Sequence, residues 1–486
     1  MLRFDQIRLS PRFYVLTILL LSIFLCFWKL GTHPLHQWDE SRYGENAYWM
    51  LQKGDYVNFY YADEIDTWNA KPPLTAWLIS LNYRIFGFNE WALRMHSAVA
   101  GVLFFMVFYV LLLIYKPPIF AFISSLILLS VKGLIGHHVA RTGDTDALLV
   151  LFLMASLYFS LLYIDYKKKW AVIPAFLMLG LAFYAKGFTF LFYLPGVGVY
   201  LLLRQRLIPL LKEWRFWAGL MMLGLTIFSW YFLVKQYGIP FEDERYPGTN
   251  SWEVMINYDI LARFTESGVE GNDQPVDYLF LLKALDVKFN LWNYVMYMGI
   301  LIASVKLYFK RSNLRRWFMH KENRIYLLSI SIFLTLGGLL TISQSKLIWY
   351  VAPLVPFGAI LCTWGIAKAV RWKNITGYLW LGLILFTLGR QVYYVNDVPE
   401  NYGSMIRENK TQLASGQNIW LYHPHNQDVR LYADWFHHSV KYTEAPLSTI
   451  SQHPEDGVIG HFDIGELEGK GEFICRDEIC VFLPMR

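Results

Sequence analysis

Acidic and basic side chains that could act together in catalysis stand at the ends of apolar stretches of this chain. They are Asp39, Glu40, Lys71, Asp144, Asp146, Lys186, Arg263 and Lys346. A carboxylate can remove a proton from a hydroxyl group, and Lys or Arg can stabilise charge that develops on a phosphate. Ionisable residues at membrane depth are costly, so their accumulation indicates a functional path. Whether they meet depends on the elements that carry them.

The composition predicts a polytopic membrane protein. Of the 486 residues, 55% are hydrophobic and only 17% are charged, whereas a soluble protein of this length carries nearer a quarter charged residues. Aromatic residues make up 18%, which fits side chains at membrane interfaces. The first apolar stretch, 13–30, is too long for the apolar region of a signal peptide, so we expect a permanent anchor.

Eleven stretches are long and apolar enough to cross the hydrocarbon core. They are 13–30, 93–115, 118–136, 146–164, 170–185, 187–203, 216–236, 288–309, 325–342, 347–367 and 376–395, and 276–287 can form a further short helix at membrane level. If successive spans cross the membrane in opposite directions, every dense cluster of Lys and Arg falls on the same side. Such clusters are typical of cytoplasmic loops. We therefore expect a cytoplasmic N-terminus and a C-terminal segment on the outer face.

The first outer loop, 31–92, has an unusual pattern. The segments "DESRYGENAYWMLQKGDY" and "KPPLTAWLISLNYRIFGF" predict two amphipathic helices at the membrane interface, the second with Pro72 and Pro73 in its first turn. All eight ionisable residues named above fall on this predicted outer face. Their shared location favours a common site over eight independent occurrences.

Several of these residues also have a purely structural interpretation. Lys186 can extend toward water from the end of a helix, and Asp146 can be the N-cap of the helix that follows it. His137 and His138 suggest a metal pair, but adjacent residues on a helix point about 100° apart, which disfavours joint ligation.

The last segment, 396–486, is polar and contains no spanning stretch. Alternating runs such as "NIWLYHP", "GVIGHF" and "EFICRDEICVFL" predict short strands, so we expect a small α+β domain after a transmembrane domain of residues 1–395. In "CRDEIC", Cys475 and Cys480 are either a hairpin disulfide, if the compartment is oxidising, or two reduced structural cysteines.

Three motifs carry a resemblance to a known family. "WDESRYGENAYWMLQKGDYV" and "AKPPLTAWLISLNYRIFGFNEWALRMHSAVAGV" resemble the first outer loop of bacterial lipid A aminoarabinose transferases and their protein O-mannosyltransferase-like relatives. "DTDALLVLF" resembles the family's Asp-x-Leu-Leu, and "SKLIWYVAPLVP" resembles its Lys-Leu-x-x-Tyr-x-x-Pro-x-x-Pro. The similarity covers residues from about 10 to 365, and the first loop is its most specific part.

The resemblance implies an all-α polytopic membrane protein of the C-type glycosyltransferase fold, with about 11–13 transmembrane helices. It implies transfer of a sugar from a polyprenyl (undecaprenyl) phosphate donor on the outer face of the bacterial inner membrane. Asp39 and Asp146 match its catalytic carboxylates. The substrate-binding set that we predict consists of Glu40, Arg42, Lys71, Arg263, Lys346 and Tyr350, of which Lys71, Arg263 and Tyr350 hold the donor phosphate.

Two features of this set stay open. Glu40 can be a second base, a metal ligand or a partner for Arg42. Ala70 stands where aminoarabinose transferases carry a Glu that can ligate a metal. No cofactor is therefore certain, and a divalent metal stays open. For the same reason, aminoarabinose is not implied as the sugar.

The chemistry is consistent with these residues. A sugar linked through phosphate has a good leaving group, so a base on the acceptor hydroxyl and cations on the phosphate suffice, and direct displacement inverts the sugar carbon. The expected partners are the lipid-linked donor, a lipid or protein acceptor and membrane lipids, without nucleic acid. Neither G-x-G-x-x-G nor a P-loop is present, which argues against a nucleotide-sugar enzyme. The alternative is a secondary transporter or a flippase of lipid-linked sugars, but the internal repeat typical of transporters is not found.

Overall fold

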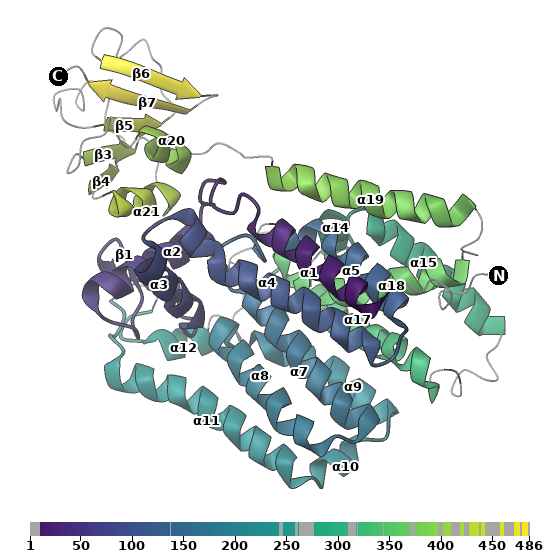
Figure 1. Cartoon of the computed structure of the whole chain (residues 1–486). Coiled ribbons are helices and arrows are strands. Elements are labelled where there is room, and N and C mark those ends of the chain that lie inside the picture. The colour runs from purple at the N-terminus through teal and green to yellow at the C-terminus, as the bar shows by residue number, and fades with distance from the viewer. Residues whose placement is uncertain are drawn as a thin grey trace.

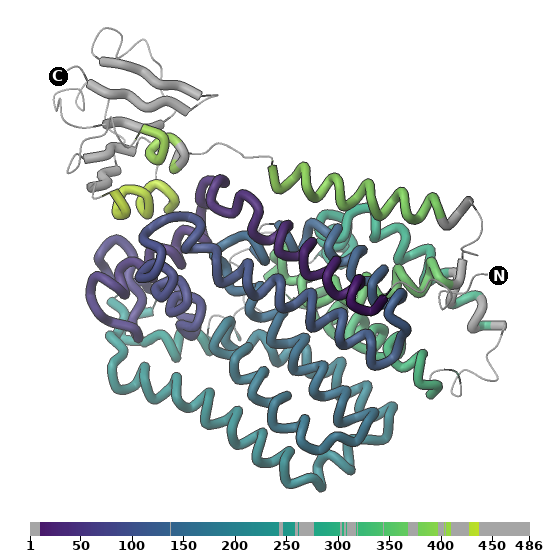
Figure 2. Tube along the Cα trace, viewed as in Figure 1, coloured from purple at the N-terminus to yellow at the C-terminus, as the bar shows by residue number. Residues whose placement is uncertain are grey.

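The fold is that of a computed structural model, in which a helical bundle carries a small sheet at one end (Figure 1). The structure describes residues 10–136, 138–242, 246–257, 261, 277–309, 317, 319–343, 345–369, 375–396, 402–409, 418–421, 427–436, 439–442, 457–460, 471–476 and 479–484. In the tube of Figure 2, the purple first helix runs toward the end of the bundle where residues 31–92 lie.

Each of the eleven predicted spans coincides with a helix. These are α1 (Pro11–Phe27), α4 (Glu90–Leu113), α5 (Pro118–Leu129), α7 (Asp146–Tyr166), α8 (Val172–Lys186), α9 (Leu194–Leu203), α11 (Trp214–Tyr237), α15 (Leu291–Phe309), α17 (Arg324–Ile342), α18 (Val355–Ala369) and α19 (Ile375–Asn396). Among the described residues, six helical runs are long and apolar enough to cross a membrane, judged by length and composition. One of them joins two predicted spans in a single run, Lys169–Leu203.

Shorter helices connect the long ones. They are α6 (Lys132–Ile135), η2 (Lys169–Ala171), η3 (Gly187–Tyr193), α10 (Leu207–Leu211), α12 (Ser251–Ile256), α14 (Phe280–Phe289), η6 (Lys321–Asn323) and η7 (Ile348–Leu354), where η marks a 3₁₀-helix. The short helix expected at 276–287 is α14. The 3₁₀ stretch η3 follows α8, and the 3₁₀ stretch η7 precedes α18. Both stretches lie at the same end of the bundle.

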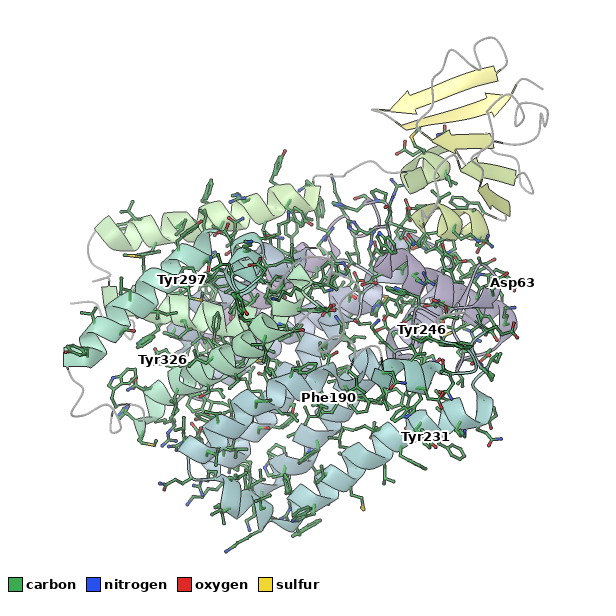
Figure 3. All side chains as sticks on the ribbon, turned by 180° about the vertical axis from the view of Figure 1, so that it is seen from behind. Asp63, Phe190, Tyr231, Tyr246, Tyr297 and Tyr326 are labelled. Carbon is green, nitrogen blue, oxygen red and sulfur yellow. The ribbon has the colours of Figure 1, made fainter. Side chains whose placement is uncertain are left out.

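The helix α7 is the centre of the bundle. Apart from Asp146 and Asp165 it is uncharged, and it packs between α4 and α8 with most of its side chains buried. A helix that is apolar on all sides is buried by its neighbours. By contrast, α11 exposes Met221, Leu225 and Phe228 on the outside of the bundle, as expected of a surface that faces lipid. Seen from behind, Tyr231 of α11 lies at the edge of the bundle and Phe190 lies in its interior (Figure 3).

The first outer loop forms the two predicted helices, α2 (Asp39–Lys53) and α3 (Leu74–Phe86), joined through a two-residue hairpin of β1 (Tyr60–Tyr61) and β2 (Glu64–Ile65). Of the apolar face predicted for this helix, Tyr43, Ala47 and Met50 are buried and Leu51 is half-buried. Polar residues of α2 are buried as well, among them Glu40, Glu45 and Asn46, so the helix is covered on most of its sides. The prediction for Pro72 and Pro73 is wrong, because α3 begins at Leu74 and both prolines precede its first turn. Proline lacks the backbone N–H and restricts the residue before it, so it sets the start of the helix.

The C-terminal segment forms the predicted α+β unit. Its strands β3 (Asn418–Leu421), β4 (Ser439–Tyr442), β5 (Gly457–Gly460), β6 (Gly471–Arg476) and β7 (Ile479–Pro484) make a sheet of order β4-β3-β5-β7-β6. The pairs β4–β3 and β3–β5 are parallel, and the pairs β5–β7 and β7–β6 are antiparallel. In the β6–β7 hairpin, the Cα atoms of Cys475 and Cys480 are direct cross-strand partners.

Two helices of this unit, α20 (Tyr402–Asn409) and α21 (Gln427–Trp435), pack on the first outer loop. The hydroxyl group of Tyr432 donates to Glu90 at 2.7 Å and accepts from the backbone N–H of Leu35 at 3.2 Å. Arg407 forms an ion pair with the same Glu90 at 3.1 Å. These contacts join the C-terminal helices to the loop that carries Asp39.

Within this contact, Asp428 predicts a pH-dependent stability. Its carboxylate is buried and accepts from the backbone N–H of Gly403 at 3.0 Å. Burial raises the pKa of Asp428 to about 6, from an ordinary value of 3.8. The folded state binds the proton of Asp428 more tightly than the unfolded state does, so protonation stabilises the fold. This stabilisation is complete below about pH 4 and is lost as the pH rises through about 6. This rise in the pKa of Asp428 corresponds to about 3 kcal/mol in the free energy of unfolding.

The variant Asp428→Asn keeps the acceptor for Gly403 and removes the titration. We expect the unfolding temperature of the wild type, relative to Asp428→Asn, to fall between pH 4 and pH 7. Thermal unfolding of both purified proteins across this range checks it. If the unfolding temperatures of the two proteins change in parallel with pH, the pKa of Asp428 does not differ between the folded and unfolded states.

Candidate functional site

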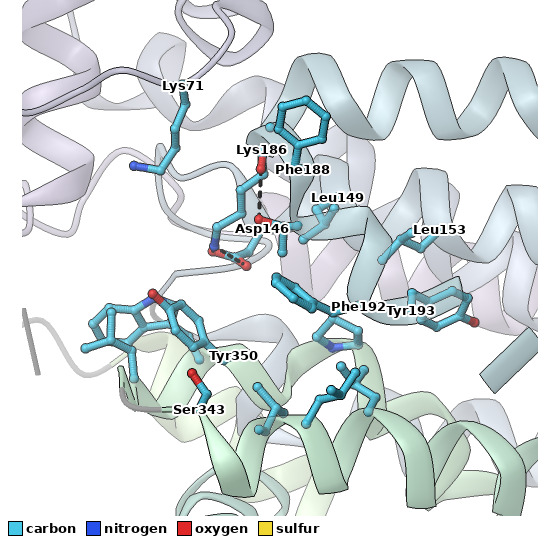
Figure 4. Close-up of a pocket in the computed structure, with 18 of the residues that line it drawn as sticks. Lys71, Asp146, Leu149, Leu153, Lys186, Phe188, Phe192, Tyr193, Ser343 and Tyr350 are labelled. Atoms are coloured by element: carbon cyan, nitrogen blue, oxygen red, sulfur yellow. Dashed lines mark hydrogen bonds and ion pairs between the residues drawn. The ribbon is translucent and has the colours of Figure 1, made fainter. Parts of the chain in front are cut away.

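Four of the eight charged residues predicted to act together line one pocket (Figure 4). It is lined by Asp39 at the start of α2, Lys71 in the loop before α3, Asp146 at the start of α7, Lys186 at the end of α8, and Tyr350 in η7. Five separate parts of the sequence therefore place a polar group in the same cavity, at the end of the bundle that carries the first outer loop.

Most of the remaining lining is apolar, although Trp68, Thr189, Tyr193, Ser343 and Trp349 also carry polar atoms. The purely apolar side chains are Leu149, Leu153, Phe188, Phe192, Met255, Leu336, Leu339, Leu340, Leu347 and Pro353. None of these side chains has a hydrogen-bonding group, so they can contact a hydrocarbon chain but cannot orient a sugar. The pocket thus suits a molecule with a polar head and an apolar chain.

A buried ion pair fixes the start of α2. The carboxylate of Glu40 accepts from Arg94 of α4 at 2.6 and 2.8 Å, from the backbone N–H of His36 at 2.8 Å and from that of Gly143 at 2.8 Å. Arg94 also donates to the backbone carbonyls of residues 30, 33 and 34. Although burial opposes it, the Arg94 guanidinium holds the pKa of Glu40 below its ordinary value. Glu40 is therefore an ionised anchor with both oxygens occupied.

Asp39, the neighbour of Glu40 in sequence, has a different environment. Its Oδ2 lies 3.6 Å from Nδ1 of His138, and the same nitrogen lies 3.3 Å from Oδ1 of Asp144. Burial and the charge of Asp144 raise the pKa of Asp39, while His138 and Lys71 oppose them. The imidazole of His138 stacks on Trp349 with ring centroids 3.7 Å apart, which fixes its orientation. A carboxylate with a raised pKa in a pocket is suited to accept a proton.

Asp146 and Lys186 form a close pair beside this cluster. Nζ of Lys186 donates to the two carboxylate oxygens of Asp146 at 2.7 and 2.6 Å, and it lies 5.6 Å from the ring centroid of Tyr350. The structural interpretations are wrong here, since the N-cap of α7 is Thr145 and Lys186 is ion-paired. Gly187 follows with φ 58°, a conformation that L side chains adopt at a cost, so the chain can turn sharply after Lys186.

Lys71 provides a second cation. Its Nζ lies 5.1 Å from the ring centroid of Trp68, and within the described part of the chain it forms no ion pair with a carboxylate. A cation beside an aromatic ring and at the mouth of a cavity remains available to an anionic ligand.

Arg42 is held away from the pocket. It binds Asp66 through two hydrogen bonds, 2.9 and 2.6 Å, and its guanidinium lies 4.6 and 4.9 Å from the rings of Tyr61 and Trp68. The alternative in which Glu40 pairs with Arg42 is wrong. The contacts of Arg42 support Trp68, which in turn lies beside Lys71.

Lys346 is not among the described residues that line the pocket. Nζ of Lys346 donates to the backbone carbonyl of Asp277 at 3.1 Å, which ties the segment before η7 to the start of α14. Arg263 lies outside the described residues.

The cluster of Asp39, His138 and Asp144 also has the atoms that a divalent metal requires. One ligand atom from each residue lies within 4.8 Å of the others. One imidazole nitrogen with two carboxylate oxygens is a donor set that suits zinc and similar ions. In this cluster His138 combines with two carboxylates, and His137, whose joint ligation with His138 the sequence disfavoured, lies outside the described residues.

Comparisons with known proteins agree with this geometry. Residues 70–232 match the family model described as dolichyl-phosphate-mannose-protein mannosyltransferase. An uncharacterized protein of Aquifex aeolicus is 25% identical over 383 residues, which cover 78% of this chain and 70% of that protein. The undecaprenyl phosphate-alpha-4-amino-4-deoxy-L-arabinose arabinosyl transferase of Aeromonas hydrophila is 30% identical over 200 residues, which cover 40% of this chain and 36% of the transferase. This chain therefore spans little more than a third of that relative.

The crystal structure of ArnT from Cupriavidus metallidurans bound to undecaprenyl phosphate matches 98% of both chains with a TM-score of 0.66 and 16% identity. This chain has the fold of ArnT. The predicted resemblance and the predicted fold class, an all-α polytopic membrane protein with a small C-terminal α+β unit, are confirmed. The family model and the arabinosyl transferase agree with the predicted enzyme class, a glycosyltransferase.

The sequence prediction missed two residues that build the site. Arg94 stands in the segment "WALRMHSA" of the family resemblance, but no role was predicted for it, because its sequence neighbours do not reveal the partner of the arginine. His138 was considered only as a metal ligand together with its neighbour. Its position between Asp39 and Asp144 depends on a backbone φ of 69°, which no helical pattern predicts.

Glu40 and Lys71 should therefore respond differently to mutation. Glu40→Gln leaves the buried Arg94 charge without its partner and should lower the free energy of unfolding by about 3–5 kcal/mol. Lys71→Met removes a cation that has no ion pair among the described residues, so its effect on stability should stay below about 1 kcal/mol. Unfolding of the purified variants in detergent measures both. Equal destabilisation would contradict the assignment of Glu40 as the anchor.

Proposed function

We propose that this chain is an integral membrane glycosyltransferase that moves a sugar from a polyprenyl phosphate to an envelope lipid or protein. The observation that carries the proposal is a single pocket in which Asp39 and Lys71 lie beside an apolar wall. This combination fits the phosphate, the sugar and the hydrocarbon chain of such a donor. The similarity to the arabinosyl transferase supports the same choice of donor.

In this mechanism, Lys71 and the hydroxyl group of Tyr350 bind the donor phosphate, and Asp39 is the base. Asp39 removes the proton from the acceptor hydroxyl as its oxygen bonds to the anomeric carbon of the sugar. The bond between that carbon and the phosphate oxygen breaks, and the electron pair leaves with the polyprenyl phosphate. Lys71 stabilises the charge that develops on the phosphate. Direct displacement inverts the configuration of the sugar carbon.

Asp146 and Lys186 act as a pair in this proposal. Their close ion pair leaves the pocket with little net charge at that position, and Lys186 lies against the ring of Tyr350. A phosphate that approaches Lys186 competes with the carboxylate of Asp146 for the N–H donors of the Lys186 ammonium group. Asp146, once released, can orient the acceptor or balance positive charge on the sugar ring.

The other predicted substrate-binding residues take supporting roles. Glu40 and Arg42 position Asp39 and Trp68 through contacts within the protein. Lys346 holds the segment that leads to Tyr350. Arg263 is proposed as a further phosphate ligand on the resemblance alone. A divalent metal, if the enzyme uses one, would be held by Asp39, His138 and Asp144 and would polarise the acceptor hydroxyl.

The proposal includes an orientation. The N-terminus is cytoplasmic, and the pocket and residues 396–486 lie on the outer face, because the loops rich in Lys and Arg then all face the cytoplasm. Residues 396–486 form a separate domain after the transmembrane domain 1–395. Its helices α20 and α21 pack on the first outer loop, so this domain supports the catalytic end of the bundle.

Two substitutions separate catalysis from donor binding. Asp39→Asn should lower the transfer rate by about 10²–10⁴-fold while undecaprenyl phosphate still binds, because the phosphate ligands are intact. Lys71→Met should weaken undecaprenyl phosphate binding and lower the rate by about 10²–10³-fold. Lys53→Met, which removes a cation that pairs with the exposed Asp63, is the matched control and should leave both unchanged.

The measurement combines purified protein, undecaprenyl-phosphate sugars and envelope lipids or proteins from a strain that lacks the gene, and follows product masses. Binding is followed separately by titration with undecaprenyl phosphate. Product formation by Asp39→Asn at the wild-type rate would exclude Asp39 as the base. Failure of the wild type to bind undecaprenyl phosphate would overturn the choice of donor.

A further inference from the structure

A second polar cavity lies between α19, α6 and the junction of α14 with α15. Its volume is about 290 Å³, and it shares no lining residue with the pocket of Asp39. The polar residues that decide its chemistry are Ser130, Lys132, Asn290, Arg390 and Gln391. The cavity lies near the C-terminal end of α19, whose last residue accepts from Nε1 of Trp28, which follows α1, at 3.2 Å. This end of α19 is therefore the end nearest the first outer loop.

Gln391 gives the cavity an unsatisfied donor. Its side chain is 3% exposed, and its Nε2 has no hydrogen-bond partner among the described residues. The neighbouring polar groups are already engaged, since Nε1 of Trp292 donates to Oγ of Ser130 at 2.8 Å and that hydroxyl donates to the carbonyl of Ile127 at 2.7 Å. A buried amide without an acceptor is costly, so its presence indicates a ligand that accepts hydrogen bonds.

Two cations flank the same cavity. Nζ of Lys132 lies 4.4 Å from the ring centroid of Tyr394, and Nη1 of Arg390 lies 3.5 Å from Oδ1 of Asn290. Among the described residues neither cation forms an ion pair, and no Asp or Glu lines the cavity. Two uncompensated cations with a buried amide donor favour an anion with several acceptor oxygens, which is the chemistry of a phosphate.

The surface next to the cavity is suited to hydrocarbon. Most of the outward side of α19 is apolar and exposed, and its exposed members include Tyr378, Leu379, Leu381, Leu385, Phe386 and Tyr393. In a membrane such a surface faces lipid chains. A phosphate held in the cavity is therefore adjacent to a surface along which acyl chains can lie. Basic pockets between membrane helices are known to bind lipid head groups in this manner.

We propose that the cavity formed by Lys132, Arg390 and Gln391 binds the phosphate of a membrane lipid whose chains lie along α19. The lipid occupies a site separate from the pocket of Asp39 and Lys71. The proposal does not depend on the transfer reaction, because none of its residues takes part in the proposed mechanism.

Native mass spectrometry of the full chain in detergent tests the site. The probes are dioleoylphosphatidylglycerol and dioleoylglycerol, which lacks the phosphate. The double variant Lys132→Met/Arg390→Met and the single variant Gln391→Leu should bind the phospholipid about tenfold more weakly than the wild type. The matched control, Lys283→Met/Arg84→Met, removes two cations outside the cavity and should bind it as the wild type does. Retained binding in the cavity variants would overturn the proposal, as would equal binding of dioleoylglycerol by the wild type.

Inorganic phosphate distinguishes a lipid site from a site for the free anion. Millimolar phosphate should not displace the phospholipid, because it lacks the chains that contact α19. Displacement at that concentration would show that the cavity binds free phosphate and would overturn the lipid proposal.

A second measurement needs no variant. A phosphatidylglycerol with a photoreactive head group should label residues 387–394 of the wild type in preference to residues 375–386, the other half of the same helix. Even labelling along α19 would show that the lipid contacts the helix without a head-group site, and would overturn the proposal even if a variant failed to fold.

Discussion

The ion pair of Glu40 with Arg94 is the constraint on which the catalytic end of the bundle depends. Both side chains are almost fully buried, and ionised groups in such a position must be paired and hydrogen-bonded to be tolerated. Glu40 reaches α4, the turn before α2 and the loop before α7 through one carboxylate. Arg94 adds the carbonyls of the segment that follows α1. Three parts of the chain are thereby fixed around the first residue of α2, which is Asp39.

The pocket contains both signs of charge, but only one of its two lysines is ion-paired among the described residues. Lys186 lies within hydrogen-bond distance of both oxygens of Asp146, whereas Lys71 is kept beside Trp68, in a loop that the Arg42–Asp66 pair stabilises. A ligand phosphate can therefore meet Lys71 without first displacing a carboxylate of the described protein. The many apolar side chains of the lining lower the local polarity, which strengthens the attraction between Lys71 and an anion.

Much of this could be predicted from the sequence, because apolar length and amphipathic period are local properties. All eleven predicted spans coincide with helices, and α2 buries Tyr43, Ala47 and Met50 as its period indicated. The resemblance selected Asp39, Lys71, Asp146 and Tyr350, which meet in one pocket. The partners of charged residues could not be predicted in this way. Arg94 stands 54 positions after Glu40, and His138 reaches Asp39 only through a left-handed backbone conformation.

Asp39 and Glu40 show how far neighbouring carboxylates can diverge. Glu40 faces the interior, where Arg94 and two backbone N–H groups outweigh the effect of burial and keep it ionised. Asp39 faces the pocket, where burial and the charge of Asp144 raise its pKa despite the opposing charges of His138 and Lys71. A base must be able to take up a proton and release it, so a carboxylate saturated with hydrogen bonds is unsuited to that role. Adjacent side chains on a helix point about 100° apart. Glu40 therefore faces the interior and anchors the helix, while Asp39 faces the pocket and is available to act as a base.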